Sequence, residues 1–510
     1  MNEDQKIQPH AWWTLVAVSL GTFMLLLDIT IVVVALPDIQ KALGAGFSDV
    51  QWTVDAYSLS LASLMLAAGS VADLFGRRVV FAGGLVIFTL ASLLCGLAQS
   101  SGMLIAFRAL QGIGGATIFA TSLALLAQTF HGRSRGVAFG VWGAVTAMST
   151  ALGPLLGGLL TTGIGWRWIF FVNIPLGIAA VTITLRYVQE SKPPQARRID
   201  LAGFGVFTVG LFSLIFGLIK VNGHGWTNTT SLVCFGVAVV LLAAFPFVER
   251  AVRQPMFDLA LFRKPTFVGG SIAAFAMNGS LFAMLLYFTL YLQEVLDYSA
   301  LQTGLRLAII TGATLFTAIP AGRLSAHLPV RWLIGPGLLM VGAGLLLMRG
   351  LDPSSDWTHL IPGFLVAGLG SGLVNPPLAS TAVGVVEPRF AGMASGINST
   401  FRQVGIATSV AALGSILATH TAAATGPASA RADFIDGLNV LLLISGLLAI
   451  FGGLAAIVLI RRKDFVVHTP GPRSAAGGEA GQPAGASASG ASDGATAAGE
   501  GAGPLEVSRT

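Results

Sequence analysis

The sequence predicts an all-helical protein that crosses a membrane many times. Hydrophobic residues make up 54% of the 510 residues and charged residues only 10%, and the mean hydropathy is +0.78. Soluble domains carry about 25% charged residues. The apolar runs have about the 20 residues that a helix needs to cross a bilayer. The alternating segments of about ten residues that form a membrane β-barrel are not found.

Fourteen apolar segments have this length, so we predict fourteen transmembrane helices. An even number places both ends of the chain on the same side of the membrane. The predicted spans are 12–36, 51–72, 79–98, 103–127, 136–160, 166–188, 201–220, 229–248, 266–292, 301–323, 331–350, 359–383, 390–418 and 435–460.

Basic residues indicate which side that is. Alternate connections carry most of the Lys and Arg, including the Arg77-Arg78 pair and the Arg461-Arg462-Lys463 cluster. Basic loops stay in the cytoplasm, so we predict cytoplasmic termini in a multi-pass protein of the cell membrane. The first apolar run is longer than a signal-peptide core and is predicted to be a span. This topology explains the net charge of +6 without a nucleic-acid partner.

An internal repeat relates the two ends of the chain. RSRGVAFG (133–140) and RFAGMASG (389–396) share the pattern R-x-x-G-x-A-x-G, 256 residues apart. A looser echo, 253 residues apart, joins GSVADLFGRR (69–78) to GRLSAHLPVR (322–331). Duplicated halves are typical of secondary transporters, which bind their substrate near the bilayer midplane between the halves.

The repeat and the loops together predict four segments. Residues 1–190 and 266–465 are expected to form two six-helix bundles, and 191–265 to carry two inserted helices with their linkers. Beyond them, 466–510 is rich in Gly, Ala and Ser. That composition cannot bury a core, so we expect a disordered cytoplasmic tail.

The turn GSVADLFGRR combines Gly69, Asp73, Gly76, Arg77 and Arg78. A plain cytoplasmic loop explains the arginines but not the aspartate or the spacing of the glycines. The stretch resembles the signature G-x-L-A-D-R-x-G-R-R of the major facilitator superfamily, with a leucine in place of its first arginine. In that family the loop holds the cytoplasmic side closed. A carboxylate near the positive end of a helix can do so, and the repeat places that helix near Arg389.

Two further motifs resemble the same family. LIAFRALQGIGGA (104–116) places Arg108 inside a span, where buried arginine is rare and usually functional. It resembles the family's second motif, which implies a role for Arg108 in proton coupling. The glycines that follow are expected to serve close helix packing.

STALGPLLGG (149–158) places Gly153, Pro154, Gly157 and Gly158 in one span. By itself this pattern indicates a bent, tightly packed helix. It resembles the antiporter motif G-x-x-x-G-P-x-x-G-G, with a serine for the first glycine, and that motif implies export. The aromatic string WRWIFFVNIP, which starts at 166, resembles the fourteen-helix drug:proton antiporters.

The stretch LLLDITIVVVALP (25–37) places Asp28 inside the first span. An aspartate at the bilayer centre costs about 2.5–3.5 kcal/mol on insertion scales, so we expect a function for it. The stretch resembles the subfamily motif L-D-x-T-x-V-N-V-A-L-P, in which Val33 replaces the asparagine. We expect that loss to leave Asp28 with few hydrogen-bond donors and easier to protonate.

Depth within the spans predicts a cluster of charges. At 1.5 Å per residue, Asp28, Arg108 and Asp55 should lie about 12, 8 and 6 Å below the outer surface. Asp55 is open to a second interpretation, a solvated residue at a helix end. Asn278 and Arg402 lie near mid-depth in the second half and are further candidates for the central cavity.

These observations predict a proton-coupled exporter of small amphipathic or cationic compounds, expected to act as a monomer with the proton gradient as its energy source and no cofactor. An uptake symporter or a metabolite exporter of the same fold is the main alternative. The phosphate loop G-x-x-x-x-G-K-[ST] of ATP-driven exporters is missing from the sequence. So are the H-E-x-x-H motif of a metalloenzyme and a repeated channel filter, and we therefore disfavour an enzyme or a channel.

Overall fold

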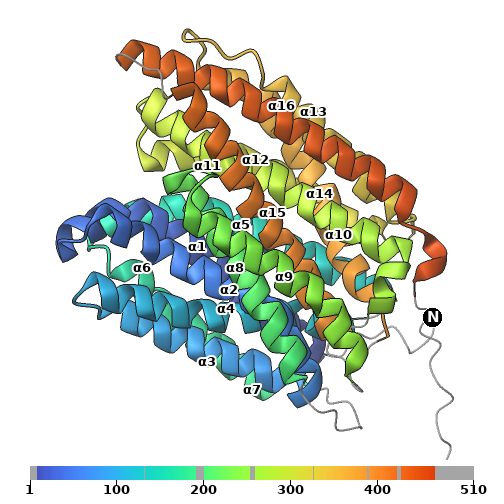
Figure 1. Ribbon diagram of the computed structural model, residues 1–510. Coiled ribbons are helices and arrows are strands. Elements are labelled where there is room, and N and C mark those ends of the chain that lie inside the picture. Colours follow the sequence, from blue (N-terminus) through green and yellow to red (C-terminus); the bar gives the residue numbers. More distant parts are fainter. Residues whose placement is uncertain are drawn as a thin grey trace, which may run out of the picture. The chain divides into compact units, whose positions relative to one another are not determined.

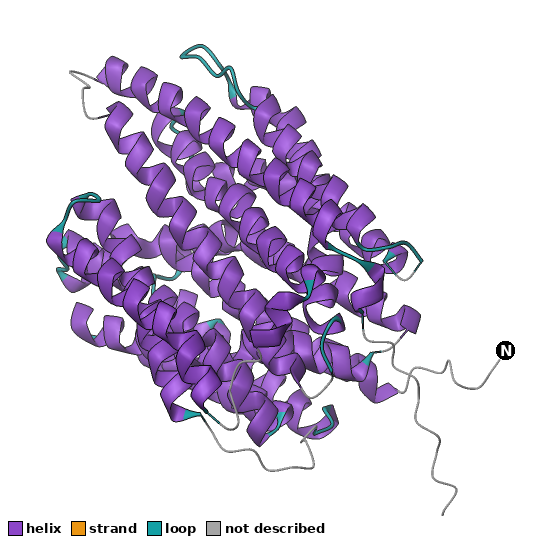
Figure 2. Ribbon diagram, turned by 45° about the vertical axis from the view of Figure 1, so that its right-hand side comes forward, coloured by secondary structure: helices purple, strands orange, loops and turns teal. Residues whose placement is uncertain are grey.

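The computed structural model describes residues 9–130, 132–190, 200–252, 259–325, 327–387, 390–421 and 427–465. Among these residues there are helices and loops but no strand (Figure 2). The predicted tail, 466–510, and most of the basic connection after the sixth predicted span lie outside the described residues.

Each predicted span coincides with a helix or a pair of consecutive helices. They are α1 (Pro9–Leu43), α2 (Phe47–Phe75), α3 (Arg77–Gly96), α4 (Ser101–Thr129), α5 (Gly132–Gly163), α6 (Trp168–Phe171) with α7 (Asn173–Tyr187), α8 (Leu201–His224), α9 (Thr229–Ala251), α10 (Pro265–Met277) with α11 (Ala283–Leu290), α12 (Ala300–Leu324), α13 (Arg331–Leu347), α14 (Ile361–Gly384), α15 (Ala391–Thr421) and α16 (Pro427–Leu459). Two π-helical segments, Asn278–Phe282 and Tyr291–Val295, continue α10 and α11, and 3-10 turns occupy Leu259–Arg263, Trp357–Leu360 and Arg462–Asp464.

Twelve stretches of described helix are long and apolar enough to cross a membrane. The helix α13 is apolar but has only 17 residues, and α5 is not among the twelve. The all-helical, multi-pass architecture is therefore confirmed, whereas the predicted count of fourteen spans is not shown.

Local sequence signals explain where several helices begin. The hydroxyl of Ser100 accepts a hydrogen bond from the first turn of α4, and the carboxylate of Asp200 does the same for α8. Ser299 and Gln302 form a reciprocal capping box at the start of α12. Such side chains satisfy backbone N–H groups that have no partner within the helix.

The long helices pack side by side along most of their length (Figure 1). In the first half, α4 packs on α2 and α3, and α1 packs on α5 and α7. In the second half, α14 packs on α12 and α13, and α16 packs on α13 and α10. The helices α8 and α9 pack on each other, and α8 also contacts α2 and α15. The inserted pair therefore lies beside one helix from each predicted half.

Close glycine contacts join the two predicted halves at two equivalent places. Gly69 of α2 lies against Gly392 of α15, and Gly322 of α12 lies against Gly136 of α5, with no room for a side chain at either crossing. The sequence repeat relates Gly69 to Gly322 and Gly136 to Gly392. The two crossings are therefore counterparts in an approximately two-fold arrangement.

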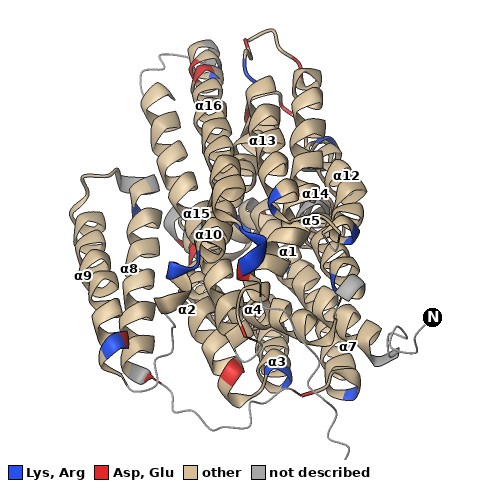
Figure 3. Ribbon diagram, turned by 90° about the vertical axis from the view of Figure 1, so that its right-hand side faces the viewer, with Lys and Arg blue, Asp and Glu red and all other residues tan. Residues whose placement is uncertain are grey.

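The start of α1 and the end of α16 lie at the same end of the helices. Trp12 contacts Phe130, at the end of α4. Just beyond, Arg135 of α5 donates a hydrogen bond to the carbonyl of Ser380, near the end of α14. Phe465, which follows α16, contacts the last turn of α14 at Gly384. Figure 3 shows that charged residues are sparse along the helices.

The predicted antiporter motif brings α5 against α1. A Cβ added to Gly153 would lie 3.1 Å from the backbone nitrogen of Ile31 and closer still to the side chain of Thr30. At Gly157 an added Cβ would lie 3.0 Å from the carbonyl oxygen of Ile31. A Cβ at Gly158 would meet no atom within 4 Å among the described residues. Two of the motif's glycines thus permit a close approach one turn from Asp28.

We predict that Gly153→Val lowers the unfolding temperature of the purified protein, because overpacking a tight contact costs about 1–3 kcal/mol. Gly158→Val is the matched control on the same helix and should leave the unfolding temperature close to that of the wild type. Fluorescence-detected thermal unfolding in detergent measures both. Equal unfolding temperatures for the two variants would show that the α1–α5 contact does not need the glycine.

Candidate functional site

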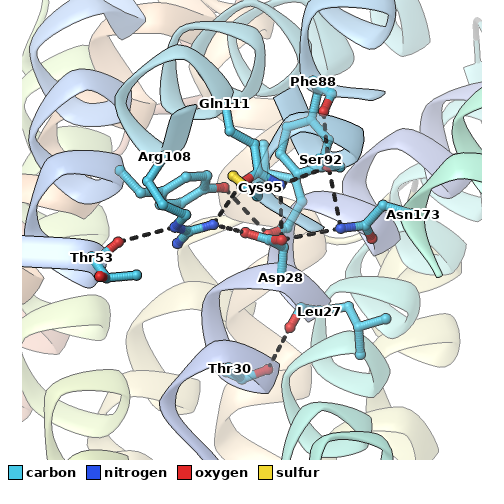
Figure 4. A network of polar contacts seen from close by, with 12 residues as sticks. Leu27, Asp28, Thr30, Thr53, Phe88, Ser92, Cys95, Arg108, Gln111 and Asn173 are labelled. Carbon is cyan, nitrogen blue, oxygen red and sulfur yellow. Dashed lines mark hydrogen bonds and ion pairs between the residues drawn. The ribbon is translucent and has the colours of Figure 1, made fainter. Parts of the chain in front are cut away.

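An ion pair between Asp28 and Arg108 forms the centre of the candidate site (Figure 4). Asp28 of α1 is 0% exposed and Arg108 of α4 is 1% exposed. The guanidinium nitrogen Nη1 of Arg108 donates a hydrogen bond to Oδ2 of Asp28. The two residues that the depth estimate placed at similar levels are therefore in direct contact, and their opposite charges compensate each other away from water.

Two amides bind the other carboxylate oxygen of Asp28. Gln111 Nε2 donates to Oδ1 at 2.8 Å, and Asn173 Nδ2 donates to the same atom at 3.0 Å (Figure 4). The expectation that Asp28 lacks donors because of Val33 is therefore wrong. Donors from α4 and α7 replace the polar neighbour that α1 lacks.

Arg108 has further partners on three sides. Its Nη1 also donates to Gln111 Oε1 at 2.7 Å, and its Nε donates to the carbonyl oxygen of Thr53 at 3.0 Å. The guanidinium carbon lies 4.1 Å from the ring centroid of Tyr57, which permits a cation–π contact. Both Thr53 and Tyr57 belong to α2, so Arg108 joins α1, α2 and α4.

Ser92 of α3 completes the network. Its hydroxyl oxygen accepts a hydrogen bond from Gln111 at 2.8 Å and lies 3.5 Å from the amide nitrogen of Asn173. The same hydroxyl donates to the carbonyl of Phe88 at 2.8 Å. Side chains from α1, α3, α4 and α7 thus form one buried polar cluster. Removing one partner of the buried ion pair at its centre would lower the folding stability by about 3–5 kcal/mol, because the other charge would stay buried without a partner.

Sequence reasoning missed three members of this network. Gln111 follows Arg108 by three residues and thus shares its helix face, a signal that could have identified it. Asn173 lies in the aromatic string that starts at 166, which was interpreted only as a family marker. Ser92 lies in an otherwise apolar run and gave no signal.

Asp55 is separate from this network. Among the described residues it forms no hydrogen bond or ion pair with Asp28 or Arg108. The charged group that interacts with Asp55 is Lys220 of α8. The Nζ atom of Lys220 lies 5.2 Å from the ring centroid of Trp52. Asp55 is therefore not a direct partner of either charge among the described residues, and its role in proton coupling or substrate binding stays a prediction. Thr53 and Tyr57, two residues away on either side, occupy the helix face that meets Arg108.

The predicted cytoplasmic latch joins α2 to the first turn of α15. Asp73 Oδ1 accepts a hydrogen bond from the backbone nitrogen of Gly392 at 3.0 Å, and Oδ2 accepts from Met393 at 2.8 Å. Arg77 forms an ion pair with Asp73 at 2.9 Å. This is the helix that the repeat indicates, although Arg389 itself lies outside the described residues. A helix N-terminus favours a carboxylate because its N–H groups and dipole are positive.

The remaining residues of the turn shape its backbone. Gly76 separates α2 from α3 with φ of 108°, a conformation that glycine adopts at low cost. The carboxylate of Glu190, beyond α7, accepts hydrogen bonds at 3.1 Å from the backbone nitrogens of Arg78 and Val79. The side chain of Arg78 donates to the carbonyl of Leu185. Arg78 and Glu190 thus stabilise the first half, while Asp73 reaches the second.

The two candidates of the second half are buried but separate from the Asp28 network. Arg402 of α15 is 5% exposed and donates to Asn398 Oδ1 at 3.0 Å and to Asn375 Oδ1 at 3.2 Å. Asn278, at the start of a π-helical segment, donates to the carbonyl of Ala274 at 2.9 Å. The structure brings Asp28 together with Arg108 and leaves Arg402 in a cluster of its own.

The fold and the buried ion pair define a multi-pass membrane protein of the secondary-transporter class. Residues 18–410 match the model of the Major Facilitator Superfamily, and the chain belongs to that superfamily. It is therefore a membrane transporter of small molecules and not an enzyme.

Two relatives of the chain carry names that refer to resistance. The chain is 38% identical to the multidrug resistance protein Stp of Mycobacterium tuberculosis (strain CDC 1551 / Oshkosh), over 82% of this chain and 78% of that protein. It is 33% identical to the tetracenomycin C resistance and export protein of Streptomyces glaucescens, over 81% of this chain and 77% of the relative. The chain is thus related to multidrug and antibiotic efflux proteins.

A solved structure has the same fold. The crystal structure of the human organic anion transporter MFSD10 (TETRAN) matches with a TM-score of 0.62, covering 88% of this chain and 100% of that one. At 16% sequence identity, the likeness concerns the fold alone.

We predict that Asp73→Asn separates the ends of α2 and α15. Hydrogen bonds to a charged group contribute about 1.5–3 kcal/mol. Weakening them should raise the ratio of molecules in which these two helix ends are apart to molecules in which they are in contact about tenfold. Electron spin resonance distances between labels at Val79→Cys and Trp332→Cys, both exposed in the wild type, measure the change after Cys95 and Cys234 are replaced by Ala.

The matched control is Glu190→Gln, which removes a carboxylate from the start of α3 without affecting α15. We expect its distance distribution to equal that of the wild type. A distribution that is unchanged in Asp73→Asn would contradict a latch at this position.

Proposed function

We propose that this protein is a proton-coupled exporter of small amphipathic or cationic compounds. The observation that carries the proposal is the ion pair between Asp28 and Arg108, buried among four helices in a chain of the Major Facilitator Superfamily. Ionisable groups inside a membrane are costly and usually serve transport. The relatives named for resistance and export support the outward direction.

The pair offers a simple way to couple proton binding at Asp28 to the arrangement of the helices around it. While Asp28 is charged, Arg108, Gln111 and Asn173 bind it and hold α1, α4 and α7 together. A proton on Asp28 removes the negative charge that Arg108 compensates, so the pair loses its main attraction. The helices can then separate, and loss of the proton restores the pair. Proton binding therefore favours one arrangement of these helices over another.

We further propose how this local change becomes alternating access. The proposed moving parts are two six-helix bundles, 1–190 and 266–465, with two inserted helices in 191–265 and fourteen spans in total. Both termini are proposed to be cytoplasmic, in agreement with the basic loops. Asp73 then closes the cytoplasmic side, as its contact with α15 suggests.

In the proposed cycle, substrate enters between the bundles from the cytoplasm or the inner leaflet. Closure of the Asp73 latch and exposure to the outside follow. Protonation of Asp28 from outside releases the substrate, and deprotonation toward the cytoplasm resets the carrier. Gly153 and Gly157 of the exporter motif place α5 against α1, one turn from Asp28. This position beside the proposed proton site supports the interpretation of the motif as one that serves export.

We predict that Asp28→Asn reduces proton-driven ethidium uptake into inside-out vesicles to the background level, because an amide cannot take up and release the proton. Asp49→Asn, on α2 and outside the network, is the control and should transport at the wild-type rate. Thermal unfolding checks that the variant folds. Transport by Asp28→Asn at the wild-type rate under a pH gradient would end the proposal.

Arg108→Ala should separate substrate binding from coupling. Without the guanidinium, Asp28 has no charged partner and needs its proton to stay buried. We expect ethidium counterflow, which needs no gradient, to persist while accumulation driven by a pH gradient is lost. A variant that still accumulates ethidium under the gradient would show that the pair is only structural.

A further inference from the structure

The second half contains a buried positive charge without a counter-ion. Arg402 lies in α15 and is 5% exposed, and no carboxylate among the described residues pairs with it. Its two hydrogen bonds end on the neutral amide oxygens of Asn398 and Asn375. Its Nη2 atom is buried and has no hydrogen-bond partner among the described residues.

The contrast with Arg108 is informative. Arg108 has a carboxylate, an amide, a backbone carbonyl and an aromatic ring around it. Arg402 is bound by two amides among the described residues, and these neutral groups cannot balance its charge. A guanidinium stays protonated in proteins, so it cannot become neutral to escape the cost of burial. Burial of an unpaired charge in a membrane interior is costly, and a bound anion would lower that cost.

Unpaired hydroxyls lie on the same face of α15. Ser395, Asn398, Ser399 and Arg402 follow the i, i+3, i+4, i+7 spacing that places residues on one side of a helix. The hydroxyl oxygens of Ser395 and Ser399 are buried and lack a partner among the described residues. Buried polar atoms usually have partners. A guanidinium nitrogen and two hydroxyls without partners among the described residues lie along one face of α15, and each of them can donate a hydrogen bond to an anion.

The asparagines hold the guanidinium in place. Asn375 of α14 donates to the carbonyl and the hydroxyl of Ser371 on its own helix, which turns its amide oxygen toward Arg402. Asn398 accepts from Nε on the other side. With Nε and Nη1 bound in this way, Nη2 is the part of the fork that remains available for a ligand.

We propose that Arg402, positioned by Asn375 and Asn398, binds an acidic group of the transported compound, such as a carboxylate. This inference rests on the proposed exporter function and adds amphipathic compounds that carry an anionic group to its substrate class. The Asp28–Arg108 pair in the first half handles the proton, and the Arg402 cluster in the second half recognises the substrate.

A matched pair of dyes tests the proposal with purified protein. Rhodamine B and its ethyl ester share the same cationic ring system and differ in whether the carboxyl group is free. Fluorescence polarisation measures binding of each dye without any proton gradient. We expect the wild type to bind rhodamine B about tenfold or more tightly than the ester, since a hydrogen bond between charged groups contributes about 1.5–3 kcal/mol.

The variants separate the charge of Arg402 from its structural role. Arg402→Gln should bind rhodamine B about tenfold or more weakly than the wild type does, and the ester with an affinity within about twofold of the wild type. The variant should therefore lose the preference for rhodamine B. Arg402→Lys keeps the charge but not the planar fork, so it should fold and retain part of the preference. Arg431→Gln removes an exposed arginine of α16 and should bind both dyes as the wild type does.

Three results would overturn the proposal. A wild type that binds the two dyes equally, or does not bind rhodamine B, has no carboxylate site. If Arg402→Gln still prefers rhodamine B, the carboxylate binds at a site other than Arg402. If labelled chloride binds in an Arg402-dependent manner and rhodamine B does not displace it, the occupant is an inorganic anion. Asp28→Asn keeps the dye preference in this scheme, so failure of proton coupling and failure of the anion site give different results.

Discussion

The ion pair between Asp28 and Arg108 organises the first half of this transporter because burying either charge alone in an apolar interior is costly. An aspartate at the bilayer centre costs about 2.5–3.5 kcal/mol, and removing one partner of a buried pair costs about 3–5 kcal/mol. The surrounding helices therefore supply donors and acceptors for both groups. Gln111 of α4 and Asn173 of α7 bind the carboxylate, and the backbone of α2 accepts from the guanidinium. In the proposed cycle, the relative positions of these helices depend on whether Asp28 carries a proton.

The helix α2 connects this pair to the opposite end of the protein. Near its beginning, Thr53 and Tyr57 contact Arg108; near its end, Asp73 binds the first turn of α15. Between them, α2 packs along α4 and α15, and Gly69 permits the close approach to Gly392. A helix with a contact at each end could connect the proposed proton site to the proposed latch.

Much of this architecture follows from patterns in the sequence. Apolar runs of spanning length located the helices, and the repeat correctly indicated the partner of Asp73, because duplicated halves cross at equivalent glycines. The surroundings of Asp28 were harder to predict. Val33 suggested an isolated acid, whereas its donors come from α4 and α7, far along the chain, and only packing brings them together. For Asp55, depth along the helix axis gave no information about which face of α2 the side chain occupies. The pairing of Arg402 with amides also depends on packing, in this case between α14 and α15.

The central claim is that Asp28 takes up a proton at its site, and infrared difference spectroscopy of the reconstituted protein tests it most directly. Acidification should produce the carbonyl stretch of a protonated carboxylic acid, and Asp28→Asn should remove that band while Asp49→Asn keeps it. A spectrum of Asp28→Asn that is identical to the wild type across the acidification range would contradict the account.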